Sequence, residues 1–174
     1  MSRGFVKEED QEEAPFIPPR ADLPAGTINY VTPAGYEKLL YERNELETEL
    51  TSITVTDEKE KRHLTAVLTG KLTLLNERIA SARILDPKDQ PREEVRFGAR
   101  VKFRIIEGEQ KGSERQFQFV GVDEADIKKN KIAFFAPIAR VITGKKVGEI
   151  AEFRRGPAIQ KFEITSIEYD TSIE

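Results

Sequence analysis

Hydrophobic residues in the first half of the chain recur at alternating steps of three and four. In residues 33–53 the apolar positions of this repeat, with Arg43 at the one missing step, are Tyr36, Leu39, Leu46, Leu50 and Ile53. In the next stretch they are Leu68, Leu72, Leu75, Ile79 and Ala82. Such spacing aligns apolar side chains in one seam along a helix. The pattern predicts two helices that pack as an antiparallel coiled-coil hairpin over residues 31–90.

Capping residues predict where both helices begin. Thr32 is a good cap for the first helix, and Pro33 suits the first helical position, where its missing N–H is not needed. The β-branched run at 51–56 disfavours helix and predicts the connection. We expect the second helix to begin near Asp57 and to end near Ile84. At 1.5 Å per residue, arms of about 20–28 residues extend roughly 30–40 Å.

From Val95 onward apolar residues alternate with polar ones, which is typical of half-buried β-strands. Strands are predicted at 100–105, 115–120, 131–135, 150–154 and 161–169. Residues 107–112 suit a hairpin loop, and 136–143 a short helix that ends at Gly144. We expect residues 93–174 to form a mostly antiparallel β domain with one short helix. The predicted fold class is α+β.

Residues 1–30 have the composition of a tail rather than of a core. The first 25 contain four prolines and six acidic residues against three basic ones, which equals the whole net charge of −3. Such a segment buries too little apolar surface to offset the entropy of ordering it. We expect an extended or disordered tail whose acids mainly keep the protein in solution. Its apolar stretches, Phe5-Val6 and Phe16-Ile17-Pro18-Pro19, are candidates for docking on a neighbouring surface.

Composition excludes several classes of site. The 174 residues include no Cys and one His, which excludes disulfide scaffolds, thiolate sites and His-rich metal centres. We expect no metal and no cofactor of the protein's own. No apolar run reaches the roughly 20 residues that span a bilayer, and Met1–Asp10 has no signal-peptide core. We therefore expect a soluble, cytoplasmic protein without membrane contact.

Three segments of the C-terminal half resemble a known family. Residues 120–132 (VGVDEADIKKNKI), 136–140 (APIAR) and 144–149 (GKKVGE) closely resemble the C-terminal domain of bacterial transcript cleavage factors of the GreA/GreB family. Residues 32–39 and 82–86 are similar to the two ends of that family's coiled coil. The resemblance covers roughly residues 30–170 in the same order.

This resemblance implies a C-terminal domain like that of FK506-binding proteins (FKBP-like) and bacterial RNA polymerase as the partner. In the family this domain docks on the rim of the polymerase secondary channel, and the coiled coil enters the channel. The residues that correspond to the docking loop are Phe135, Ala136, Pro137, Ile138 and Arg140. Two adjacent aromatics on one strand cannot both face the core, so we expect Phe134 or Phe135 to be exposed and available to a partner. The alternative is that the short helix folds back over that ring.

The sequence departs from the family at the tip of the hairpin. The family has the motif Gly-Asp-Leu-x-Glu-Asn-Ala-Glu-Tyr there, whose acids help to hold the second Mg²⁺ for cutting backtracked RNA, and this chain lacks it. Asp57, Glu58 and Glu60 are the only acids at the predicted turn, and the hairpin is shorter by roughly four turns, about 20 Å. Asp57 and Glu60 also suit a capping box. We favour capping over contact with the polymerase-bound Mg²⁺.

A basic cluster follows the predicted turn. Lys59, Lys61 and Arg62 are candidates for contact with RNA or with the channel interior, and the alternative is a solvated helical face paired with Glu58 and Glu60. We interpret His63 as a surface histidine rather than a ligand.

The favoured function is that of a monomeric, non-enzymatic elongation factor that binds polymerase and meets nascent or backtracked RNA only indirectly. Its effect on elongation then needs no efficient cleavage. One alternative is a true cleavage-stimulating factor that uses Asp57 and Glu58. Another is a prolyl isomerase or chaperone, which shares the FKBP-like fold. We disfavour it because that chemistry needs an aromatic-rich pocket and the chain has no Trp.

Overall fold

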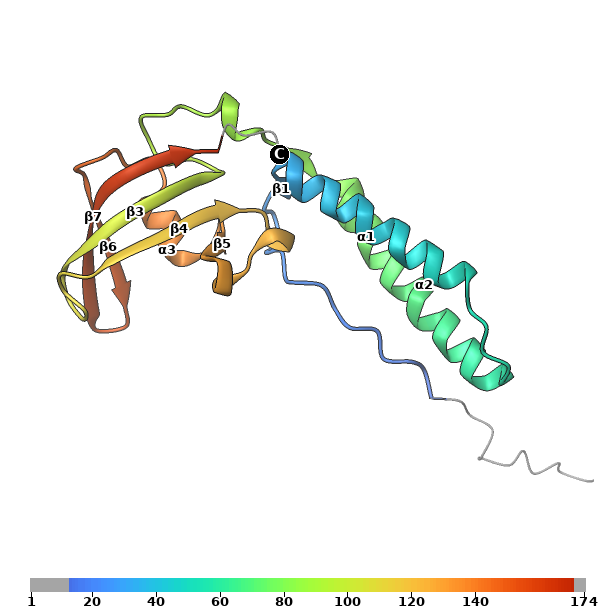
Figure 1. The fold of residues 1–174 in the computed structure, drawn as a ribbon. Helices are drawn as coiled ribbons and strands as arrows, with labels where there is room; N and C mark the ends of the chain where they lie inside the picture. Colours follow the sequence, from blue (N-terminus) through green and yellow to red (C-terminus); the bar gives the residue numbers. More distant parts are fainter. Residues whose placement is uncertain (1–12, 171–174) are drawn as a thin grey trace, which may run out of the picture.

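The computed structural model describes residues 13–170, which form a helical hairpin beside a β domain (Figure 1). This is the α+β class that the sequence predicts. Phe5-Val6 and most of the tail acids lie outside the described residues. Within residues 13–170, no helix is both long and apolar enough to cross a membrane.

The hairpin consists of α1 (Pro33–Thr51) and α2 (Glu58–Ser81). The Thr32 hydroxyl accepts a hydrogen bond from the Gly35 N–H at 3.0 Å, so the first cap lies where the sequence places it. Leu39 of α1 and Leu75 of α2 are buried in the seam between the helices. Half-buried residues of the predicted repeat extend this contact along the hairpin: Tyr36, Leu46, Ile79 and Ala82.

The second helix ends earlier than the sequence suggests, because the chain after it joins a small ladder. The strand β2 (Arg83–Ile84) pairs in parallel with β1 (Tyr30–Val31). The Arg83 N–H donates to the Asn29 carbonyl at 2.8 Å, and the Leu85 N–H donates to the Val31 carbonyl at 2.9 Å. The ladder ties together the two ends of the hairpin.

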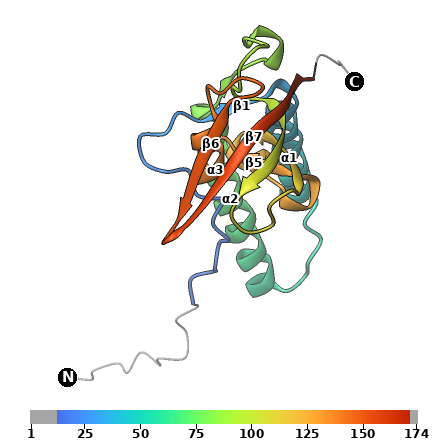
Figure 2. The ribbon, with the colours of Figure 1, turned by 90° about the vertical axis from the view of Figure 1, so that its left-hand side faces the viewer.

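The β domain is a five-stranded sheet with the spatial order β5-β4-β3-β7-β6. Its strands are β3 (Ala99–Glu107), β4 (Glu114–Val120), β5 (Lys131–Ala133), β6 (Ile150–Arg155) and β7 (Ala158–Tyr169). All neighbours are antiparallel except β4 and β5, which run parallel. Figure 2 shows β6 and β7 side by side.

The core of this domain lies between the sheet and the short helix α3 (Pro137–Ile142). Alternate residues of the central strand β3, namely Val101, Phe103 and Ile105, are buried, as period-two alternation requires. Ala139 and Ile142 of α3 are buried in the same cluster.

Residues 13–29 run without helix or strand alongside the hairpin before entering β1 (Figure 1). Within the predicted docking stretch, Ile17 lies against Gly70 of α2, where an added Cβ would be 2.0 Å from its Cδ1 atom. The neighbouring Phe16 is 78% exposed. Only part of this stretch therefore contacts the hairpin.

Candidate functional site

The tip of the hairpin presents its acids as helix-capping groups. Asp57 is the N-cap of α2, and its Oδ1 accepts a hydrogen bond from the Glu60 N–H at 2.7 Å. Glu58 and Glu60 lie in the first turn, where carboxylates complement the helix dipole. Among residues 13–170, His, Cys, Asp and Glu side chains form no group of three or more that could hold a metal ion. The geometry agrees with the capping interpretation of Asp57.

The basic cluster lies on the exposed start of α2. Lys59, Lys61, Arg62 and His63 are all exposed, in agreement with the interpretation of His63 as a surface residue. Lys61 and Arg62 also line a shallow depression of about 620 Å³ on α2. Its other residues are Glu58, Thr65, Ala66, Thr69, Gly70 and Thr73. Contact of Lys59, Lys61 and Arg62 with RNA or with the channel interior stays a prediction.

A row of aromatic rings crosses the sheet of the C-terminal domain. Four neighbouring strands each contribute one ring, in the order Phe117, Phe103, Phe162 and Phe153. Ring centroids within this row are 6.0, 4.9 and 6.1 Å apart. The two central rings are buried, whereas Phe117 and Phe153 are only half-buried. The row therefore forms an apolar floor with partly open flanks.

This row lines a groove of about 800 Å³, which is completed by Ile105 and by the start of α3. Pro137 and Ile138 form the α3 side. Charged groups surround the apolar floor, namely Arg115, Arg154, Arg155 and Glu109. Arg154 is paired with Glu152 at 2.9 Å, and the three guanidinium groups still outnumber Glu109 and Glu152, so the rim is basic. We call this feature the aromatic groove.

The aromatic groove corrects one argument from the sequence. The absence of Trp led us to disfavour an aromatic-rich pocket, but phenylalanines alone build one. All four phenylalanines of the row lie in strands that the sequence predicts, so the sequence does indicate an aromatic residue on each of these strands. Their common face depends on the register between strands, and the sequence does not reveal that register.

The expectation of one exposed aromatic at 134–135 is wrong. β5 ends at Ala133, so both residues lie in the turn after the strand and the alternation rule does not apply. Both are half-buried, with ring centroids 5.3 Å apart. Phe134 also contacts Tyr30 at 5.6 Å and Phe97 at 5.4 Å. Phe135 therefore belongs to an aromatic cluster rather than to an open surface.

The other members of the predicted docking loop are placed differently. Ala136 is the N-cap of α3 and is half-buried. Pro137 is exposed at the first position of the helix, and Ile138 lies beside it in the aromatic groove. Arg140 is exposed one turn on. The structure thus brings Pro137 and Ile138 together with the aromatic row, and it separates Phe135 from them.

The hairpin and the β domain meet through a polar junction at η3 (Val122–Glu124). Glu124 accepts hydrogen bonds from the Thr32 N–H at 3.1 Å and from the Thr32 hydroxyl. Its neighbour Asp123 lies 3.5 Å from Nε of Arg78 on α2. Sequence analysis did not identify this junction, because its residues are far apart along the chain.

Comparison with known proteins identifies relatives of this chain, one of which covers both the hairpin and the β domain. The family model described as "Transcription elongation factor, GreA/GreB, C-term" matches residues 90–169. The transcription elongation factor GreA of Thermodesulfovibrio yellowstonii is 30% identical over 155 residues, covering 80% of this chain and 96% of that protein. GreA of Maricaulis maris is 34% identical over 100 residues, covering 58% and 62% of the two chains.

The solved structures that match this chain have lower sequence identity to it. The GreA factor homolog 1 (Gfh1) protein of Thermus thermophilus covers 82% of this chain and 99% of its own, with 19% identity and a TM-score of 0.36. The GreA/GreB factor of Nitrosomonas europaea covers 80% and 98%, with 18% identity and a TM-score of 0.39.

Proposed function

Because the chain belongs to the GreA/GreB family of transcription elongation factors, we propose that it acts by binding RNA polymerase. The aromatic groove is the docking surface, and it binds at the rim of the secondary channel. The hairpin then enters the channel and modulates elongation without efficient transcript cleavage. The observation that carries this proposal is the half-open row of aromatic rings beside Pro137.

The composition of the aromatic groove supports docking on a protein partner. Aromatic side chains, phenylalanine included, and Arg are enriched at the centres of protein interfaces. Here Phe117 and Phe153 flank the floor, and the basic rim favours a partner segment with acidic side chains. Pro137 and Ile138 add apolar contact at one end.

The tip geometry supports modulation without cleavage. Mg²⁺ takes oxygen ligands at about 2.0–2.1 Å, so a carboxylate must reach the ion closely. One oxygen of Asp57 is already used as a cap. With 19 and 24 residues, the arms of the hairpin are roughly 28 and 36 Å long. An arm four turns shorter than the family pattern ends roughly 20 Å short of the metal.

A charge-reversal pair on the rim tests the docking surface. We expect Arg154→Glu/Arg155→Glu to weaken binding to core RNA polymerase at least tenfold, because both reversals oppose the acidic partner that the rim favours. Both side chains are exposed, so the melting temperature should change little. Binding is measured by biolayer interferometry at fixed salt concentration.

The matched control is Lys128→Glu/Lys129→Glu, which makes the same change in net charge on exposed residues of η4 (Ile127–Lys129). These residues do not line the aromatic groove. We expect the control to keep most of its affinity. Equal affinities of the rim variant and the wild type would contradict the docking assignment, and so would equal losses in both variants.

A prolyl isomerase is the second candidate function, because the aromatic groove is the kind of pocket that such chemistry needs. A proline-peptide isomerisation assay separates the two candidates. We expect the wild type not to accelerate cis–trans isomerisation of the prolyl bond, because a docking surface only needs to bind its partner and does not need to rotate a peptide bond. Acceleration that saturates with peptide would favour the isomerase instead.

A further inference from the structure

Four charged side chains meet where the N-terminal segment, the hairpin and the β domain come together. Arg20 comes from the N-terminal segment, Glu42 from α1, Arg78 from α2 and Asp123 from η3. Side chains of Arg20, Arg78 and Asp123 are only 18%, 11% and 9% exposed, whereas Glu42 is 44% exposed. Two cations and two anions balance, as largely buried charges require.

Arg20 joins the two domains through a single guanidinium group. Its Nη1 and Nη2 atoms donate to the two carboxylate oxygens of Glu42, at 2.7 and 3.1 Å. On the other side, Nη2 and Nε donate to Oδ1 of Asp123, at 2.8 and 3.2 Å. The hydrogen bond to Glu42 is the main reason that the pKa of Arg20 lies above its ordinary value. The rigid, planar fork of an arginine fixes both carboxylates in one geometry.

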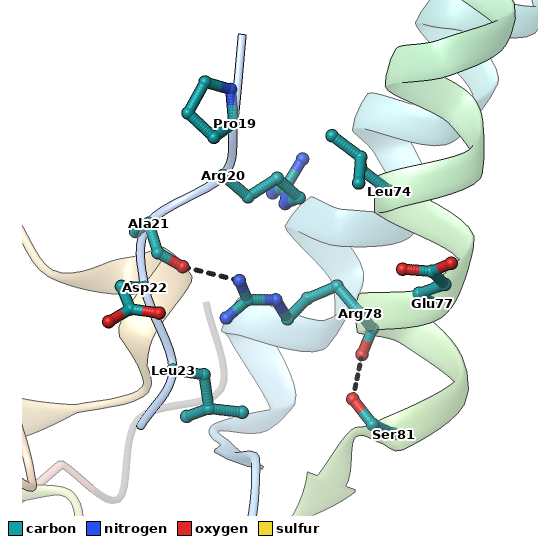
Figure 3. Close-up of a pocket in the computed structure, with 9 residues that line it drawn as sticks. All are labelled: Pro19, Arg20, Ala21, Asp22, Leu23, Leu74, Glu77, Arg78 and Ser81. Carbon is teal, nitrogen blue, oxygen red and sulfur yellow. Dashed lines mark hydrogen bonds between the residues drawn. The ribbon is translucent and has the colours of Figure 1, made fainter. Parts of the chain in front are cut away.

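The segment around Arg20 is held to the hairpin on both sides. The Arg78 Nη2 atom donates to the Ala21 carbonyl at 2.5 Å (Figure 3). On the other side, Ile17 lies against Gly70. Pro18 and Pro19 between them restrict the backbone and favour an extended course. A cavity of about 360 Å³ separates part of this segment from Leu74 and Glu77 of α2 (Figure 3).

We propose that residues 13–24 form a strap and that Arg20 is a positioning residue, which sets the angle between the hairpin and the β domain. Within residues 13–170, the other polar contacts between these two parts lie near the base of the hairpin, at Thr32 and Arg78. Contacts at the base act as a pivot. Glu42 lies roughly 15 Å further along α1 from Thr32, so the Arg20 link opposes rotation about that pivot.

The lever arm makes this angle important at the tip. Because α2 has 24 residues, a rotation of about 10° moves its far end by roughly 6 Å. Without Arg20, the link between Glu42 and Asp123 is lost, and Asp123 keeps only the longer contact with Arg78 at 3.5 Å. Removing one partner from a largely buried charged group costs stability there. The hairpin then samples a wider range of angles while each domain stays folded.

Spin-label distances test the strap, because the chain has no native Cys. Exposed sites suit the labels: Glu47→Cys on α1 and Lys102→Cys on β3 of the full chain. Pulsed electron paramagnetic resonance should give one narrow distance distribution with Arg20 intact. We expect its width to increase at least twofold in Arg20→Ala. Arg20→Lys should fall between them, because lysine restores the charge without the fork.

Two further variants keep the test decisive. Arg104→Ala removes the exposed pair with Glu114 inside the β domain and should leave the distribution unchanged. Glu42→Gln breaks the same link from the partly exposed hairpin side and should broaden the distribution as Arg20→Ala does. Unchanged widths in both Arg20→Ala and Glu42→Gln overturn the proposal. Equal broadening in Arg104→Ala does so too, and no outcome depends on polymerase binding.

Discussion

Replacing Asp57 by Asn and, separately, by Ala distinguishes a helix cap from a metal ligand at the hairpin tip. Asn caps a helix about as well as Asp, whereas Ala offers no acceptor. Both substitutions remove the carboxylate that a Mg²⁺ ion needs. If Asp57 is a cap, Asp57→Ala therefore destabilises the start of α2 and Asp57→Asn does not. If Asp57 is a metal ligand, both variants lose transcript cleavage equally.

The magnitude follows from the single bond that the cap makes. The Oδ1 of Asp57 accepts from the Glu60 N–H at 2.7 Å, and the residue is exposed. Losing such a cap costs about 1 kcal/mol. Leu68 is the first buried residue of α2, so the turns before it open locally rather than with the whole protein. A local loss of about 1 kcal/mol raises the exchange rate of the Glu60 amide roughly fivefold.

Hydrogen exchange and a transcript assay measure the two roles separately. We expect faster exchange of the Glu60 amide in Asp57→Ala and nearly wild-type exchange in Asp57→Asn. On stalled, backtracked complexes we expect the wild type and both variants to leave the transcript uncut. All three should still compete with a cleavage-active GreA factor for polymerase.

One result refutes this reasoning. If the wild type cuts backtracked transcripts and both variants lose that activity equally, Asp57 acts through its charge on the metal. The tip of the hairpin would then reach the active site of the polymerase, contrary to what its length predicts.

Two further predictions concern Tyr169, whose hydroxyl donates to the Glu94 carbonyl at 2.6 Å and accepts from the Arg96 N–H at 2.9 Å. Tyr169→Phe should lower the free energy of unfolding by about 1–2 kcal/mol in urea titrations at pH 8, and an unchanged value would contradict it. Desolvation by burial is the main cause of the raised pKa of Tyr169. The contribution of Tyr169 to the free energy of unfolding is therefore complete below about pH 10, the pKa of tyrosine in the unfolded chain. It is lost as the pH rises through the higher pKa of Tyr169 in the folded protein. Wild-type and Tyr169→Phe stabilities should converge at alkaline pH.

Much of the fold is predictable because its signals are local. Thr32 and Asp57 bond to backbone N–H groups three residues away, so the sequence alone indicates where both helices begin. Alternation along 100–105 likewise identifies β3 and its buried face. The family resemblance adds the order of the elements, since residues 30–170 follow the GreA/GreB pattern.

Local signals fail where a distant segment competes for the same backbone. The apolar repeat continues to Ala82, yet α2 ends at Ser81 because β2 pairs with β1. The expectation for Phe134 and Phe135 fails for a different reason. It assumes a strand through 135, whereas β5 ends at Ala133 in a local turn, where the Ala136 N–H donates to the Ala133 carbonyl at 2.9 Å.

The sequence by itself determined the helices, most of the strands, their order and the candidate tip acids, because these depend on neighbours within a turn or along a strand. Only the tertiary structure decided which side chains meet. The aromatic groove depends on the register of four strands, and the Arg20 link joins residues 22 and 103 positions apart. The physical reason is that hydrogen bonding along the backbone is local, whereas the partners of a side chain depend on how the completed elements pack.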